Sequence, residues 1–111
     1  MKPALPETFA ALSDPTRMAV IAMLSQEPRR AGELATALEM SPAALSRHLR
    51  ILRRSGLIAE EGIFDDARVR IYHLCPKPFD QMHGWLEDVR QFWAGQLDAF
   101  KRHVDKKRRT K

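Results

Sequence analysis

The chain has 111 residues, of which 44% are hydrophobic and 30% charged, and its composition shows no internal break, so we expect one compact domain with its own core. No apolar run approaches the roughly 20 residues of a membrane span, and the first residues lack the basic and apolar regions of a signal peptide, so we expect a cytoplasmic protein without membrane contact. The net charge of +5 favours a polyanionic partner, and the single cysteine, Cys75, excludes an internal disulfide.

Two helices are predicted before Pro28. A short first helix should begin near Pro6, because apolar residues recur at helical spacing: Leu5, Phe9 and Leu12. Asp14 followed by Pro15 is typical of a helix N-cap and a first helical residue. The second helix then has one apolar face, which consists of Met18, Ile21, Ala22 and Leu24.

Two further helices follow, joined by three or four residues. The first should cover residues 31–39, with an apolar face made of Leu34, Ala35 and Leu38. Ser41 and Pro42 repeat the cap and proline start, and the next helix continues to Gly56, a residue suited to a helix end. Two short helices joined in this way, the second rich in arginine, are typical of a helix-turn-helix.

A β-hairpin is predicted after this helix pair. Residues 57–58 and 69–74 have strand character, and Asp65, Asp66 and Ala67 should form the turn between them. Pro76 and Pro78 should end the second strand.

The last predicted element is a helix from Phe79 to Val104. At 1.5 Å per residue it would extend about 39 Å, which is longer than a domain of this size is wide. Its apolar stripe must therefore be covered elsewhere, and a second copy of the chain could cover it together with the strip on the first helix. The residues expected at this dimer interface are Leu5, Phe9, Met82, Trp85, Val89, Phe92, Trp93, Leu97 and Phe100.

Much of the positive charge lies at the end of the chain. Residues 101–111 hold seven Lys or Arg and one acid, whereas the other residues hold twelve basic and thirteen acidic groups. Such a run is usually a solvated tail, and its functional interpretation is an arm that adds nonspecific attraction to phosphates. We therefore divide the chain into a domain over residues 1–104 and a basic tail over 105–111.

The arginine-rich helix after Ser41 has two unlike faces. At roughly 100° per residue, Leu45, Leu49 and Leu52 share one side, with His48 and Ile51 beside them. The opposite side has four arginines and no acid, so their repulsion is unrelieved unless phosphates relieve it. The alternative is an exposed basic face without a partner.

Binding to double-stranded DNA explains this pattern. A helix in the major groove presents its N-terminal residues to the bases, and here small residues allow close approach. Arg47 and Arg50 are placed to reach guanine edges or phosphates, and Arg53 and Arg54 to meet the backbone. His48 is interpreted as a packing or hydrogen-bonding residue. The predicted DNA-binding residues are Ser41, Pro42, Ala43, Ser46, Arg47, Arg50, Arg53 and Arg54, with Arg68 and Arg70 on the hairpin.

The segments ALSDPTRMAVIAML, AGELATALEMSPAALSRHLRILRRSGLI and ARVRIYHL, in this order, resemble the ArsR/SmtB family of winged helix-turn-helix repressors. The resemblance covers the chain from about Phe9 to Val104. It implies a mainly α fold with a small β-hairpin wing and a long C-terminal dimerisation helix. It also implies a homodimer that represses transcription from a palindromic operator and releases it on a signal, with an effector that the sequence leaves unknown.

The chain departs from the metal-sensing members of that family, so we expect neither a metal nor another cofactor. Residues 31–35 have no thiol where those members have a thiolate pair. Asp80 and His83 could imitate one ligand pair of the last helix, but Ala94 and Leu97 stand near the place of the second. An intersubunit site that also uses His103 of the second copy is the alternative. The predicted wing turn also lacks the glycine that is frequent in the family.

Other functions remain possible at this stage. A winged helix can serve as a protein-interaction module without specific DNA binding, and the aromatic last helix could pair with a foreign helix. Trp85 and Trp93 could line a small-molecule pocket, although such a stripe is more often packing. An enzyme is not expected, because the Ser, His and Cys residues form no nucleophile, base and acid set.

Overall fold

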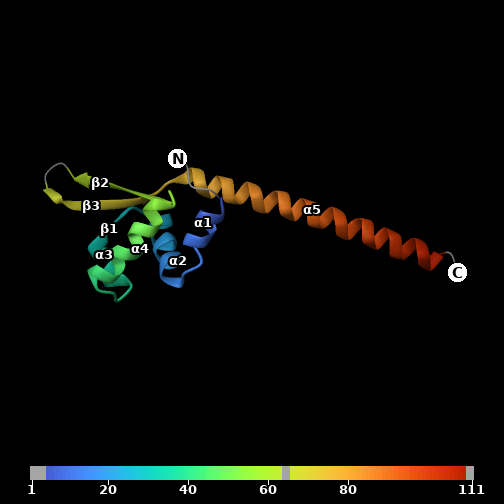
Figure 1. The fold of residues 1–111 in the computed structure, drawn as a ribbon, viewed down its shortest axis with the longest axis horizontal. Helices are drawn as coiled ribbons and strands as arrows, with labels where there is room; N and C mark the ends of the chain where they lie inside the picture. Colours follow the sequence, from blue (N-terminus) through green and yellow to red (C-terminus); the bar gives the residue numbers. More distant parts are fainter. Residues whose placement is uncertain (1–4, 64–65, 110–111) are drawn as a thin grey trace.

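The computed structural model describes residues 5–63 and 66–109. Within them the elements are α1 (Leu5–Ala11), α2 (Pro15–Gln26), β1 (Arg29–Arg30), α3 (Ala31–Ala37), α4 (Pro42–Arg54), β2 (Ile58–Ile63), β3 (Asp66–Leu74) and α5 (Pro76–Arg109) (Figure 1). The helix pair α3 and α4, followed by the hairpin β2 and β3, forms a winged helix-turn-helix. The predicted mainly α fold with a small wing and a long last helix is confirmed.

The boundaries of α2 and α4 follow the predicted cap signals. The Asp14 carboxylate accepts a hydrogen bond from the Arg17 backbone N–H at 3.1 Å, and Ser41 Oγ accepts one from the Ala44 N–H at 3.2 Å. A proline follows each cap, at a position where the missing N–H costs no hydrogen bond. Gly56, with φ of 79°, lies in the left-handed region and ends α4 as predicted.

The sheet has three antiparallel strands in the order β1-β3-β2. The sequence patterns do not predict β1, because two arginines have no strand signal and pair with Tyr72 and Ile71 from far along the chain. Both hairpin strands are longer than predicted. Asp66 and Ala67 lie in β3, so the prediction that they form the turn is wrong, and Asp65 lies outside the described residues.

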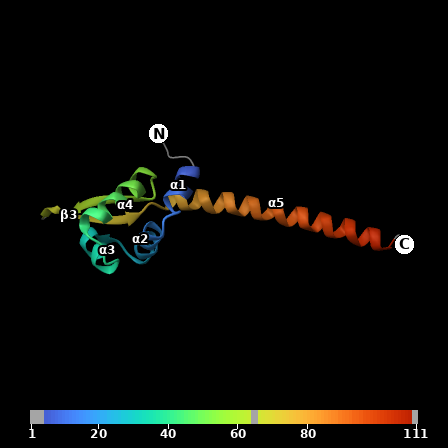
Figure 2. The ribbon, with the colours of Figure 1, turned by 60° about the horizontal axis from the view of Figure 1, so that its bottom comes forward.

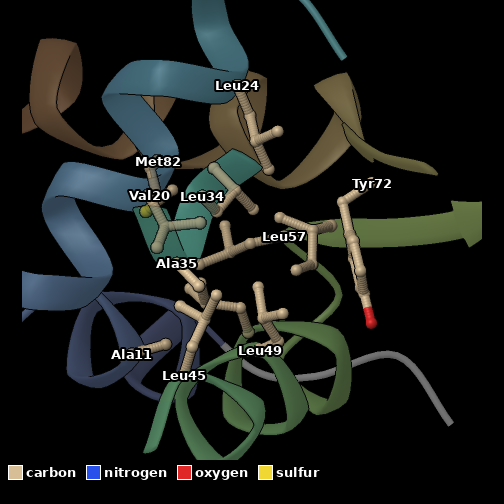
Figure 3. Close-up of a cluster of buried hydrophobic side chains, with 12 residues drawn as sticks. Ala11, Val20, Leu24, Leu34, Ala35, Leu45, Leu49, Leu57, Tyr72 and Met82 are labelled. Carbon is tan, nitrogen blue, oxygen red and sulfur yellow. The ribbon is translucent and has the colours of Figure 1, made fainter. Parts of the chain in front are cut away.

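The core lies where α2, α3 and α4 meet the sheet (Figure 3). The apolar face predicted for α4 is buried here, and Leu34 and Leu57 are also fully buried. Figure 3 shows these side chains converging from separate elements, with the Tyr72 ring at the edge of the cluster. The buried apolar residues are Ala11, Val20, Leu24, Leu34, Ala35, Leu45, Leu49, Leu52, Leu57, Ile58, Tyr72 and Met82. The helix-turn-helix is therefore held rigidly by its own core.

One residue, Cys75, separates β3 from α5. Its backbone N–H donates a hydrogen bond of 2.9 Å to the Leu57 carbonyl, which fixes the junction to the beginning of the hairpin. Pro76 and Pro78 lie in the first turn of α5, where proline is tolerated, so the predicted start at Phe79 is too late. The helix also continues past the predicted end, and residues 105–109 of the predicted tail are helical.

The helix α5 projects far from the rest of the molecule (Figures 1 and 2). The molecule measures 78 × 30 × 22 Å, and its radius of gyration is 20.7 Å, whereas a compact domain of this length has a radius of about 13 Å. The prediction of one compact domain is therefore wrong for the last helix. Within the part of the chain that the structure describes, no helix is long and apolar enough to cross a membrane.

Candidate nucleic-acid interface

The exposed face of α4 has the predicted composition. Arg47 and Arg50 are exposed on the side opposite the buried leucines, and at the beginning of the helix the exposed residues are small. Backbone and arginine side chains can therefore both approach a groove. The exposed residues of this face are Ser41, Pro42, Ala43, Ala44, Ser46, Arg47, Arg50, Arg53 and Arg54. Their contact with DNA stays a prediction.

The four arginines have different surroundings. Arg50, Arg53 and Arg54 together line a shallow hollow at the surface. Arg54 also borders a second hollow between α1 and α4, which Glu7 and Ile51 line as well. Among the described residues, no acidic partner is found for Arg47 or Arg50. These two side chains are therefore best placed to meet an external anion.

Arg53 is already paired within the chain. Its Nη1 lies 2.6 Å from Glu60 Oε1 of β2, and both side chains are partly exposed. The prediction that this face has no acid to relieve its charge is therefore wrong at Arg53. The sequence gives no signal for the pair, because Glu60 comes from the strand after α4 and reaches Arg53 only through the tertiary fold.

Glu60 is held from a second side. Tyr72 is its direct partner across the β2 and β3 register and is 8% exposed. Burial raises the pKa of the Tyr72 hydroxyl, and the hydrogen bond between this hydroxyl and the Glu60 carboxylate raises it further. Arg53, Glu60 and Tyr72 thus connect the arginine-rich helix to both strands of the wing.

The wing contributes one described arginine. Arg70 is exposed on β3, and its guanidinium lies over Gly62, its partner on β2. Arg68 falls within β3, but its side chain lies outside the described residues. Of the two predicted wing contacts, Arg70 therefore has the required exposure and Arg68 stays a prediction.

His48 joins α4 to the beginning of α2. Its Nδ1 lies 3.4 Å from Arg17 Nη1 and 3.7 Å from Asp14 Oδ2. Arg17 also donates from Nε to the Ala11 carbonyl at 2.6 Å, so α1, α2 and α4 are connected. The backbone N–H of Arg17 and the positive charge nearby keep the Asp14 pKa below its usual value. His48 is thus hydrogen-bonded between helices, as predicted, and does not lie on the exposed arginine face.

A second exposed surface runs along α5. Phe92 and Trp93 are 68% and 62% exposed, although such residues are normally buried. The α1 helix covers only the beginning of this stripe, where the Phe9 and Trp85 rings meet edge to face with centroids 5.5 Å apart. We call the following residues the α5 stripe: Trp85, Leu86, Val89, Phe92, Trp93, Leu97 and Phe100.

Three residues predicted for the dimer interface have a different position. Met82 is only 5% exposed and belongs to the core of its own chain, so it offers no surface to a second copy, and its assignment is wrong. Leu5 and Phe9 are partly buried against the same core, so the first helix is less free than predicted. The remaining predicted residues all lie on the α5 stripe.

Metal ligands are not brought together in the described part of the chain. No group of three or more His, Cys, Asp or Glu side chains there could hold a metal ion. Asp80 and His83 are exposed on α5, and Cys75 is a partly buried free thiol.

Comparison with known proteins supports a regulatory role. The family model for bacterial regulatory proteins of the arsR family matches residues 14–60, from α2 into β2. The HTH-type transcriptional regulator Rv2034 of Mycobacterium tuberculosis is 30% identical over 97 residues, which cover 87% of this chain and 85% of that protein. The ArsR-like transcriptional regulator from Rhodococcus sp. RHA1 has a similar structure, with a TM-score of 0.76, 31% identity and coverage of 88% and 90%.

Similarity to a protein with an activating role is also found. The transcriptional activator HlyU of Vibrio cholerae is 42% identical over 48 residues, which are 43% of this chain and 44% of that protein. Its solved structure matches with a TM-score of 0.61 and 30% identity, over 75% of this chain and 87% of HlyU.

Proposed function

Because this chain belongs to the ArsR family of winged helix-turn-helix transcriptional regulators, we propose that it is a homodimeric repressor that binds a palindromic operator in double-stranded DNA. The observation that carries the proposal is the exposed face of α4, where Arg47 and Arg50 have no acidic partner among the described residues. A DNA-binding role also places the protein's activity in the cytoplasm and requires neither catalysis nor a cofactor.

In this proposal, α4 enters the major groove. The small residues at its beginning allow the backbone to approach the bases, and Arg47 and Arg50 then reach guanine edges or phosphates. Arg70 on the wing, with Arg68, contacts the neighbouring phosphates. The leucines beneath keep the helix at a fixed angle, because all three are buried in the core.

The α5 stripe supports dimerisation. An exposed apolar surface of this length normally marks a contact with another molecule. A second copy is the simplest partner, because it exposes the same apolar stripe, and each stripe would bury the other. The partly exposed side of Phe9 would join the edge of that contact.

Charge favours an antiparallel arrangement of the two α5 helices. Residues 76–92 contain two basic and three acidic side chains, whereas residues 93–109 contain six basic and two acidic. A parallel pair would place the two basic halves together, and an antiparallel pair places each against the more acidic half of the other chain. The midpoint of the stripe then lies near Phe92 and Trp93.

The orientation can be tested by cross-linking. In a Cys75→Ser background, His83→Cys on one chain and Lys101→Cys on the other lie about equally far from the stripe midpoint, on the same side of the helix. An antiparallel dimer gives cross-links with a short bis-maleimide only in the mixture of the two variants. Cross-links in either variant alone would indicate a parallel pair.

The DNA-binding proposal is tested by selection from a random duplex library. We expect a motif with twofold symmetry whose half-sites lie about 10 base pairs apart, or a multiple of that, because two α4 helices must reach the same side of the duplex. Binding that is weak, insensitive to salt and without a motif would favour the protein-interaction module.

Transcription from a promoter that contains the selected motif tests the direction of regulation. A dimer that occupies a promoter excludes polymerase, so we expect less transcript when the protein is added. More transcript would instead support activation, the role in the name of HlyU.

A further inference from the structure

The ion pair between Arg53 and Glu60 places a carboxylate of the same chain beside the arginine face. Arg53 is the third of the four arginines along α4, and its partner comes from the wing. A carboxylate at 2.6 Å from a guanidinium nitrogen takes the position that a phosphate oxygen would take in a DNA contact. Arg53 would therefore have to leave its carboxylate partner before it could contact DNA, whereas Arg47 and Arg50 would not.

The surroundings of Glu60 hold its carboxylate in position for the contact with Arg53. Its side chain is 26% exposed, so most of it lies against the protein. Tyr72 is nearly buried and lies directly across the strand pair, and the neighbouring Glu60 carboxylate raises the pKa of its hydroxyl. The carboxylate therefore lies between the sheet and α4, in direct contact with Arg53.

We propose that Glu60 acts as an internal substitute for a DNA phosphate, which occupies Arg53 and so lowers the sequence-independent attraction of α4 for DNA. The inference rests on the proposed DNA-binding function. Glu60 thus leaves the base-reading arginines free and weakens the phosphate contribution to binding on every sequence.

The physical reason is the origin of nonspecific binding. Sequence-independent affinity comes from the phosphates that basic side chains neutralise, each of which adds about 0.9 to the slope of log affinity against log salt. An arginine already neutralised by Glu60 adds little to that slope. Contacts to base edges are unaffected, so the pairing of Arg53 lowers only the phosphate contribution to binding, which is the same for every sequence.

The test measures binding of the full-length protein to a random-sequence duplex over a range of salt concentrations. Glu60→Gln keeps the shape of the side chain and removes its charge. Two freed arginines per dimer should steepen the slope by about 1.8, so that affinity falls about tenfold more than for the wild type between about 50 and 200 mM salt. The variant should also bind the random duplex more tightly at the lower salt concentration.

Arg53→Gln shows whether the steeper salt slope of Glu60→Gln depends on Arg53. In the wild-type background it should leave the slope nearly unchanged, because Arg53 is already paired. In the Glu60→Gln background it should cancel the gain. If Arg53→Gln alone flattens the wild-type slope by about 1.8, Arg53 already contacts phosphate and the proposal is wrong.

Glu61→Gln is the matched control, because Glu61 is the next residue of β2 and lies 3.5 Å from His73 instead of an α4 arginine. General repulsion between the wing and DNA predicts equal effects for both acids, and that outcome would overturn the proposal. Tyr72→Phe removes the hydroxyl whose pKa Glu60 raises, and we expect a smaller change in the same direction as Glu60→Gln.

The two proposals fail in different ways. A wild-type protein whose binding shows no salt dependence overturns the proposed function itself. A wild-type protein with steep salt dependence that Glu60→Gln does not change overturns only the role of Glu60.

Discussion

The winged helix-turn-helix and the projecting part of α5 contain the same kinds of apolar residue but place them in opposite environments. Leucines of α4 are buried by neighbouring elements of their own chain, whereas Leu86 and Leu97 on α5 are about half exposed. Both helices have an apolar side at helical spacing, and the difference lies in whether the chain itself covers that side. The first region is a domain with its own core, and the second is an exposed apolar surface that we propose as half of a dimer interface.

The largest effect is expected from a charge placed on the α5 stripe, because this change tests whether a second copy covers the stripe. Trp93→Asp should abolish the dimer and leave monomers or aggregates, because burying a carboxylate without a partner costs more than the contact gains. Sedimentation velocity measures the change, and Gln91→Asp, on the opposite side of the same helix, is the control that should stay dimeric. A well-folded wild-type monomer at micromolar concentration would contradict the assignment of the stripe.

Shortening one leucine in each region separates burial within one chain from burial between two chains. Leu52→Ala removes a fully buried side chain and should lower the free energy of unfolding by about 2–5 kcal/mol. Leu97→Ala should instead weaken dimerisation and make the apparent stability depend on protein concentration. Denaturant melts at two protein concentrations separate the effects. Equal, concentration-independent losses for both variants would mean that the stripe is covered within one chain.

The arginines of the two regions can be compared in the same way. Arg47→Ala should cost about 1–3 kcal/mol of specific binding, if the side chain makes a bidentate guanine contact, and relax the preference at one position of each half-site. Arg102→Ala removes the same charge from the exposed side of α5 and serves as the control. Competition assays with single-base variants of the selected motif measure both, and an equal loss of specificity in both variants would argue against α4 as the reading helix.

The basic end of α5 should have a smaller and less selective effect. Removing residues 106–111 lowers the number of phosphates within reach, so affinity should fall by the same factor for the selected motif and for a random duplex. The ratio of the two affinities is the measurement. A change in this ratio would show that the segment contributes to specificity.

The smallest expected effect concerns metals. Affinity for the selected motif should stay within about twofold when zinc, nickel, cadmium or arsenite is added in micromolar excess or removed by a chelator, since the described residues assemble no ligand group. A tenfold loss, which corresponds to about 1.4 kcal/mol of coupling, would falsify this expectation and point to an intersubunit site.

Local signals in the sequence are sufficient for much of the fold. The beginnings of α2 and α4 are predicted correctly because a cap residue and the proline after it act within a few residues. The buried and exposed faces of α4 follow from helical periodicity, and so does the α5 stripe. These properties depend on a segment and its own spacing.

Pairings between distant segments are not predictable in the same way. The strand β1 forms because β3 offers a free edge, and Glu60 meets Arg53 because the hairpin folds against α4. Met82 shares the spacing of the α5 stripe, yet it lies in the core because the rest of the domain reaches the beginning of α5. Periodicity identifies an apolar side, and only the tertiary fold determines which molecule covers it.

Because only Cys75 separates β3 from α5, a rotation of α5 should move the hairpin with it. With no linker to absorb movement and a hydrogen bond to Leu57 at the pivot, a change in helix direction turns the wing with it. A helix of this length is about 51 Å long, so a rotation of about 5° at the pivot displaces its far end by about 4 Å. In the proposed dimer, a small shift where the two α5 helices cross would conversely change the angle and the separation of the two α4 helices. In the proposed dimer, the spacing between the two half-sites would therefore be set far from the bases, where the two α5 helices cross.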